Sequence, residues 1–168
     1  MVYVEEIIAR QEALSEWQIK NIHSLVLKGI DIEEAGRYRR ENVGISGAST
    51  TLPDFLHLSV EMHRLIAWYE QANQLHPIAR AAELHTRFVK IHPFIDGNGR
   101  TGRLLLNFDL MKLGYPPAAI RKEDRLAYYD ALDAACLGGD HDAITHLVAD
   151  AVLRSLETYL SLVSPAST

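Results

Sequence analysis

The sequence predicts an all-helical domain that carries one short β-hairpin. Apolar residues recur three and four positions apart along most of the chain, which is the period of an amphipathic helix. Capping residues, prolines and glycines stand where these stretches begin and end. Residues 38–52 instead alternate apolar and polar side chains, as a strand does. We therefore expect one domain over residues 1–163 with a hairpin at 38–52, followed by a frayed tail at 164–168.

The first helices are marked by their ends. Ser15, followed three residues later by Gln18, has the pattern of a capping box at a helix start. Gly29 is placed to end that helix. Pro53 suits the first turn of a second helix over residues 54–74, where apolar residues recur at helical spacing.

Four further helical stretches follow. One opens at Pro77, and the next begins near Gly99 and stops at Gly114. The last two cover residues 123–137 and 141–161. A hairpin standing alone is marginal in water, so we expect residues 38–52 to lie against these helices or to form a mobile flap.

Length and composition restrict the class of protein. A chain of 168 residues, 48% hydrophobic, is long enough to bury one core without disulfides. Its net charge of −5 argues against coating nucleic acid or an anionic membrane. The single cysteine, Cys136, fits a reducing compartment. No apolar run approaches the roughly 20 residues that span a bilayer, and no signal peptide is visible, so a cytoplasmic protein is expected.

Residues suited to binding phosphates and to catalysis are concentrated in the segment 92–103. Gly97 and Gly99 flank Asn98, which frees the backbone to approach a ligand at the start of a helix. The exposed N–H groups of a helix start form an anion site. Arg100 and Arg103 stand three residues apart, so both guanidinium groups reach the same side.

Two further residues of this segment suit a reaction on phosphates. Asp96 offers a carboxylate where a cation bridging phosphates would lie. His92 supplies a proton acceptor that titrates near neutral pH. Taken singly, each feature has an ordinary explanation as a turn, a cap or a solvated face. Together they predict a triphosphate site with a base at its mouth.

The segment from His92 to Arg103 resembles the signature of the Fic family, His-x-Phe-x-Asp/Glu-Gly-Asn-Gly-Arg-x-x-Arg, at every specified position. Residues 14–30, 36–39 and 114–117 are also similar to their counterparts in Fic proteins. The resemblance implies the all-α Fic core with a β-hairpin flap. It further implies transfer of AMP from ATP to a Ser, Thr or Tyr hydroxyl of a protein, with release of pyrophosphate.

The resemblance assigns a role to each motif residue. His92 would be the general base, Asp96 would hold Mg²⁺, and Phe94 would anchor the loop in the core. The α-phosphate would be contacted by Gly97, Asn98 and Gly99. Arg100 would contact the β-phosphate, and Arg103 the γ-phosphate.

Outside the motif, Tyr128 and Tyr129 would line the adenine pocket. Val43, Gly44 and Ile45 would hold the target protein by strand addition. Cys136 stands where relatives usually have an asparagine that contacts the base, so another nucleotide is an alternative to ATP.

Many Fic proteins contain an inhibitory Ser/Thr-x-x-x-Glu-Gly/Asn helix, whose glutamate pairs with the second motif arginine. No such motif occurs in these 168 residues. We expect a missing N-terminal segment, or else a partner chain, to supply it. Without it, the chain is expected to modify a protein substrate, itself included.

Other functions fit the residues less well. Phosphorylation, as in Doc-like relatives, goes with lysine at the position of Gly99, and removal of AMP requires the inhibitory glutamate. A non-catalytic peptide-binding module would need neither His92 nor Asp96. A metal hydrolase would show a ligand pattern such as His-Glu-x-x-His, which does not occur.

Overall fold

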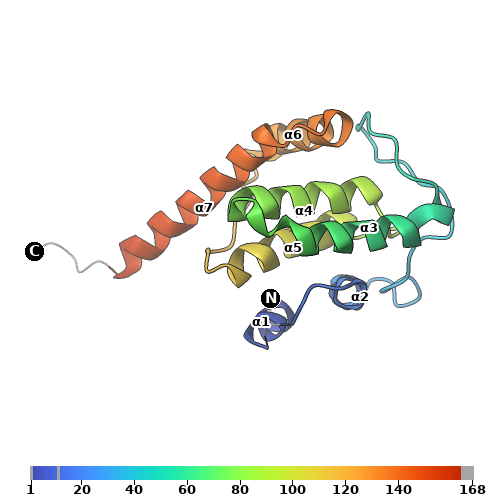
Figure 1. Ribbon diagram of the computed structural model, residues 1–168, viewed down its shortest axis with the longest axis horizontal. Helices are drawn as coiled ribbons and strands as arrows, with labels where there is room; N and C mark the ends of the chain where they lie inside the picture. Colours follow the sequence, from blue (N-terminus) through green and yellow to red (C-terminus); the bar gives the residue numbers. More distant parts are fainter. Residues whose placement is uncertain (1, 11, 164–168) are drawn as a thin grey trace, which may run out of the picture.

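The computed structural model describes residues 2–10 and 12–163, and over these residues it is all-helical (Figure 1). The tail at 164–168, expected to be frayed, lies outside the described residues. No described helix is long and apolar enough to cross a membrane. In chain order, the elements are α1 Val2–Ala9, α2 Glu16–Val26, the 3-10 turn Phe55–His57, α3 Leu58–Gln71, the 3-10 turn Ala72–Gln74, α4 Pro77–Ile91, α5 Asn98–Lys112, α6 Arg125–Gly138 and α7 Asp142–Val163.

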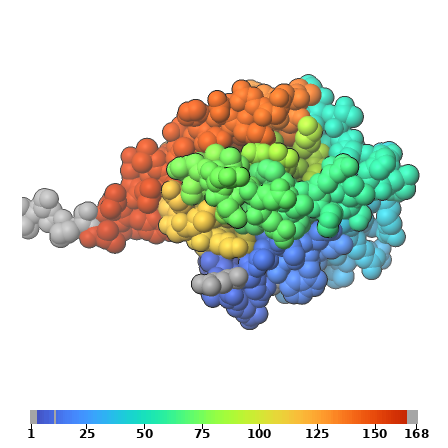
Figure 2. Space-filling view, viewed as in Figure 1, coloured from blue at the N-terminus to red at the C-terminus, as the bar shows by residue number. Residues whose placement is uncertain are grey.

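Helix α4 is the centre of the fold. It packs against α3, α5, α6 and α7, while α1 and α2 cover the far side of α5. Figure 2 shows α3 and α4 between the α6–α7 pair and the N-terminal helices, with the end of α7 projecting from the body. Gly102 allows α5 to approach α4 closely, because a Cβ there would lie 2.9 Å from His85 Nδ1. Residues 92–97, which we call the motif loop, join these two central helices.

The predicted helix starts at Ser15 and Pro77 are confirmed. Ser15 Oγ accepts a hydrogen bond from the Gln18 N–H at 3.4 Å, and the two side chains bond to each other. His76 Nδ1 accepts from the Ile78 N–H, and Pro77 occupies the first turn of α4. These ends are determined locally, which is why the sequence pattern identifies them.

The predicted β-hairpin at residues 38–52 is wrong. Val43 and Ile45 are half-buried and Gly44 is exposed, so the alternation of an extended chain is present. No strand ladder forms, however, among the described residues of this segment. The segment turns at 45–48, where the Ala48 N–H bonds to the Ile45 carbonyl at 3.2 Å.

Side chains from distant parts of the chain hold this segment instead of a second strand. Asp133 on α6 accepts hydrogen bonds from the Ser49 N–H, the Thr50 N–H and, at 2.6 Å, the Thr50 hydroxyl. At its base, Asn42 Nδ2 donates to Asp54 Oδ2 at 2.8 Å. Side-chain acceptors and donors therefore satisfy the backbone where a hairpin would use cross-strand bonds. We call residues 41–53 the flap segment.

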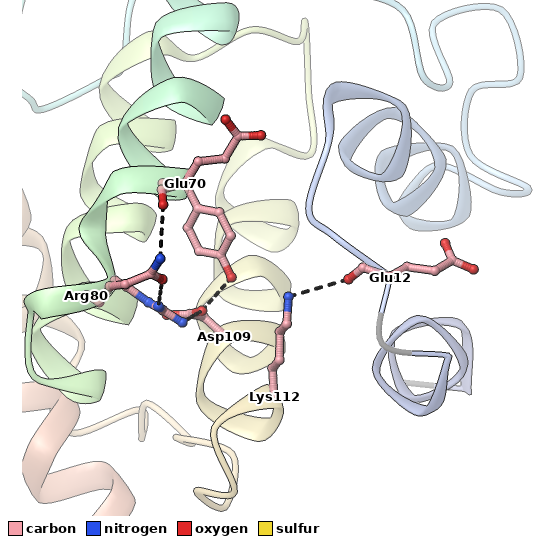
Figure 3. A network of polar contacts seen from close by, with 7 residues as sticks. Glu12, Glu70, Arg80, Asp109 and Lys112 are labelled. Atoms are coloured by element: carbon pink, nitrogen blue, oxygen red, sulfur yellow. Dashed lines mark hydrogen bonds and ion pairs between the residues drawn. The ribbon is translucent and has the colours of Figure 1, made fainter.

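A buried ion pair joins α4 to α5, and a tyrosine hydrogen bond adds α3 to it (Figure 3). Arg80 of α4 donates two hydrogen bonds to Asp109 of α5, at 2.7 and 3.0 Å. The Tyr69 hydroxyl of α3 donates to the same carboxylate at 2.7 Å, and burial raises the pKa of Tyr69. Asp109 is fully buried, so its charge depends on these partners. Sequence reasoning assigned no role to this network, which fixes α3, α4 and α5 around the motif loop.

Candidate active site

His92 lies at the C-terminal end of α4 and has the backbone geometry of a left-handed residue, with φ 50° and ψ 57°. Its Nδ1 lies 3.2 Å from the Val89 carbonyl. A carbonyl only accepts, so Nδ1 carries the proton and Nε2 of the neutral ring keeps its lone pair. Burial lowers the pKa of His92. The side chain is therefore a neutral base whose acceptor nitrogen is Nε2.

The motif loop is closed by the side chain of Asn98. Its Oδ1 accepts from the Phe94 N–H at 3.0 Å, and its Nδ2 donates to the Phe94 carbonyl at 2.8 Å. Asn98 is 2% exposed. The Asn98 side chain thus shapes the loop and is not available to a phosphate. The expected contact of Asn98 with the α-phosphate is left to its backbone N–H. As the first residue of α5, Asn98 belongs to the turn whose N–H groups lack helical acceptors.

Gly97 can be replaced by no other residue without strain. Its φ of 77° is left-handed, and a Cβ there would lie 3.2 Å from both His23 Nε2 and Val26 Cγ1 of α2. Glycine therefore lets the loop turn into α5 while touching α2.

His23 of α2, to which sequence reasoning gave no role, contacts the motif loop through Phe94 and Asp96. Its ring stacks on Phe94 with centroids 3.6 Å apart, which places Phe94 in the core as expected. Nδ1 accepts from the Gly36 N–H, so Nε2 carries the proton and donates to the Asp96 carbonyl, each at 2.9 Å. Burial lowers the pKa of His23, which favours this neutral form. The signal in the sequence was a histidine inside an apolar helix face, a common and unspecific pattern.

Asp96 and Arg100 form an exposed ion pair. Arg100 Nη2 lies 2.8 Å from Asp96 Oδ2, while Asp96 Oδ1 accepts from the Gly97 N–H at 2.6 Å. The expected metal ligand and the expected β-phosphate ligand thus contact each other. No group of three or more His, Cys, Asp or Glu side chains within residues 2–10 and 12–163 could hold a metal ion. A single exposed carboxylate fits Mg²⁺ arriving with phosphates, because this ion commonly takes one or two carboxylates and completes its shell with phosphate and water.

Arg103 projects from the second turn of α5 toward Gly99, where a Cβ would lie 3.5 Å from its Nη1. No carboxylate pairs with Arg103 among the described residues. Its neighbour Tyr128 is 3% exposed, and its hydroxyl lies 2.6 Å from His85 Nε2. Burial raises the pKa of Tyr128 to about 12, against the charge and hydrogen bond of Arg103. Tyr128 therefore packs in the core beside Arg103, and its expected place in the adenine pocket stays a prediction.

Comparison with known proteins identifies the family. The model of the Fic/DOC family matches residues 13–110, which include the whole motif loop. The chain belongs to the Fic/DOC family. Relatives named protein adenylyltransferase Fic are 38% identical over 162 residues in Drosophila mojavensis and 39% identical over 163 residues in Culex quinquefasciatus. These matches cover 95% and 96% of this chain but 32% of each relative, so the chain spans about a third of their length.

Solved Fic structures share the fold. Fic-1 from C. elegans is 32% identical with a TM-score of 0.80, and the match covers 95% of this chain and 48% of that one. A Fic domain containing signaling protein from Bacteroides thetaiotaomicron is 29% identical, also with a TM-score of 0.80, covering 92% and 65%. The prediction of the family and of the all-helical Fic core is confirmed.

In this Fic domain, the remaining residues expected at the base pocket divide into exposed and buried. Tyr129 is 45% exposed, and Cζ of Arg125 lies 5.5 Å from the centroid of its ring. Cys136 is 4% exposed, and its Sγ faces the Thr86 carbonyl at 3.9 Å. Of these side chains, Tyr129 alone presents a substantial surface to a nucleotide base.

The flap segment of this Fic domain borders a groove beside the His92 end of α4. The groove has a volume of about 440 Å³. Residues 51–53 form one wall, and side chains of α3 and α4, including Arg64, Arg87 and Lys90, form the other. The residues expected to hold a target, Val43, Gly44 and Ile45, lie in the other arm of the flap segment.

Proposed function

We propose that this Fic domain transfers AMP from ATP to a hydroxyl of a protein and releases pyrophosphate. The observation that carries the proposal is the placing of a neutral imidazole, with Nε2 as acceptor, at the entrance to the loop that opens α5. The relatives named protein adenylyltransferase Fic support the same activity.

The residues suggest a direct displacement. His92 Nε2 takes the proton of the attacking hydroxyl as its oxygen bonds to the α-phosphorus, and the bond to the pyrophosphate oxygen breaks. The N–H groups at the start of α5, around Gly97 and Gly99, face the charge that grows on the α-phosphate. Arg100 and Arg103 lie on the same helix to receive the β- and γ-phosphates.

Mg²⁺ is part of the proposal, with Asp96 as its protein ligand. When bound, the ion neutralises phosphate charge. Binding of the ion by Asp96 Oδ2 would release Arg100 from the ion pair, and the guanidinium would then be free to turn toward the phosphates. The pair therefore keeps both groups at the loop before the nucleotide arrives.

The partners follow from the same geometry. The protein substrate would lie along the flap segment, with its hydroxyl at His92. An inhibitory Glu-containing segment, supplied by a partner or by another part of a longer protein, would pair with Arg103 and block the γ-phosphate. The buried, unpaired Cys136 supports a reducing compartment such as the cytoplasm.

The test is transfer of label to protein from ATP labelled at the α-phosphate, with Mg²⁺ and a lysate, beside the same reaction with γ-labelled ATP. Label from the α-position that is absent with His92→Ala is the expected result. Label from the γ-position alone would mean a kinase and would contradict the proposal. Labelled UTP is run in parallel, because Cys136 stands where Fic relatives usually have the asparagine that contacts the base.

A further inference from the structure

Arg39 is a buried cation that no carboxylate contacts directly among the residues that the structure describes, although the charge of Asp54 acts on it from a distance. It is 2% exposed, and among the described residues it forms no ion pair. An arginine stays protonated in a protein, so its charge and its donors need other partners. The partners that the structure provides are the oxygens of two separate segments, the motif loop and the flap segment.

On the side of the motif loop, Arg39 holds the backbone of His92. Its Nε donates to the His92 carbonyl at 2.9 Å, and its own N–H donates to the Pro93 carbonyl at 2.9 Å. His92 ends α4, so its carbonyl is one of those that lack a helical donor. It is also the one described residue other than glycine with a positive φ. Arg39 thus stabilises the unfavourable backbone conformation that directs the imidazole.

On the other side, the same guanidinium holds both ends of the flap segment. Nη1 donates to the Glu41 carbonyl at 2.8 Å, and Nη2 donates to the Pro53 carbonyl at 2.6 Å. One planar group therefore joins the base to the two ends of the segment that would face the protein substrate. A shift of either end would deprive a buried donor of its acceptor and would be transmitted to the other side.

We propose that Arg39 is a positioning residue, which couples the flap segment to the orientation of the His92 imidazole. The inference deepens the proposed function and rests on it for its kinetic part. Arg39 acts in two ways. The planar set of guanidinium donors places the His92 backbone. The positive charge of Arg39 adds to burial in lowering the pKa of His92, which keeps the base neutral.

The two actions are separated by two substitutions. Arg39→Met removes both the planar set of donors and the charge, whereas Arg39→Lys retains the charge but not the planar set of donors. The His92 ring is titrated by NMR in the whole 168-residue chain without nucleotide. Lys90, Asp96 and Arg100, the other charged groups close to His92 along the chain, are the same in every variant.

Arg39→Met is expected to raise the pKa of His92, and Arg39→Lys is expected to leave it near the wild-type value. Arg40→Met, which removes the neighbouring guanidinium at an exposed position where it pairs with Glu34, is the matched control and should not move it. An unchanged pKa in Arg39→Met, or an equal rise in the control, would overturn the proposal. So would failure of both Arg39 variants to fold, since the guanidinium would then serve the fold alone.

The kinetic measurement tests the positioning. In Arg39→Lys, kcat for transfer of AMP should fall about 10²-fold, the cost of a misplacement of about 1 Å, while KM for ATP stays within about twofold. Unchanged kcat would refute the positioning role. If the wild-type chain transfers no AMP, the proposed function fails, and the NMR titration still decides whether Arg39 acts on His92.

Discussion

The Asp96 carboxylate and the Arg100 guanidinium lie 2.8 Å apart, four residues from each other at the start of α5. One group would hold Mg²⁺ and the other a phosphate, so each serves as the counter-ion of the other until the nucleotide binds. The pair is exposed, and exposed pairs contribute little to stability, so parting them costs little. The ion pair therefore holds both charged groups at the loop, and separating them adds no large barrier to nucleotide binding.

Asp96→Ala should weaken the binding of ATP at least about tenfold when Mg²⁺ is present, because the carboxylate that fits the ion is lost. Calorimetry with and without Mg²⁺ measures the effect. In the absence of Mg²⁺ the variant should bind at least as well as the wild type, since Arg100 is released. Equal affinities of variant and wild type with Mg²⁺ would leave Asp96 as a partner of Arg100 alone.

His92→Ala should abolish transfer of AMP while leaving the affinity for ATP within about threefold of wild type, because the imidazole serves the hydroxyl and not the phosphates. The rate of AMP transfer by the wild type should depend on pH through His92. Its lowered pKa keeps the imidazole neutral down to pH values below about 6.5. The rate should therefore fall only below that pH. A rate that already declines between pH 8 and 7 would contradict a neutral His92 as the base.

The stability of the domain should decrease as the pH falls from about 6.5 to about 4. Burial lowers the pKa of His85 to about 4, so between these values the unfolded chain binds a proton that the folded chain does not. Between pH 7 and 5 the loss from His85 is about 2 kcal/mol, at about 1.4 kcal/mol per pH unit. Urea unfolding at both pH values measures it.

His85→Gln is expected to reduce this dependence on pH, and His146→Gln, at an exposed position of α7, serves as the control. A pH dependence that is the same in both variants and in the wild type would show that His85 does not titrate between the folded and unfolded states.

Asp133→Asn should free the turn of the flap segment, because a neutral amide oxygen accepts more weakly than a carboxylate. The amides of residues 49 and 50 should exchange with solvent about 10-fold faster, for a loss of about 1.4 kcal/mol. Asp130→Asn, an exposed position on the same helix, is the control. Equal exchange in the two variants would mean that Asp133 does not hold the turn.

Local chemistry made several features predictable from the sequence. The cap at Ser15, the start of α4 at Pro77 and the turn at Gly97 depend on residues within one turn of each other. The motif residues stand close along the chain, so a base, a carboxylate and two arginines near one helix start followed from spacing alone. That part of the site did not need the fold.

The tertiary structure decided the rest, because it depends on groups far apart in the sequence. Alternation at Val43 and Ile45 indicates an extended chain but does not say whether a backbone or a side chain will satisfy its N–H groups, and Asp133 took that place. Tyr128 lies in the core, where its hydroxyl meets Nε2 of His85 from another helix at 2.6 Å. The geometry of His92 likewise depends on Arg39, whose donors find their acceptors only when the flap segment and the motif loop come together. Such contacts arise from packing, which no local pattern encodes.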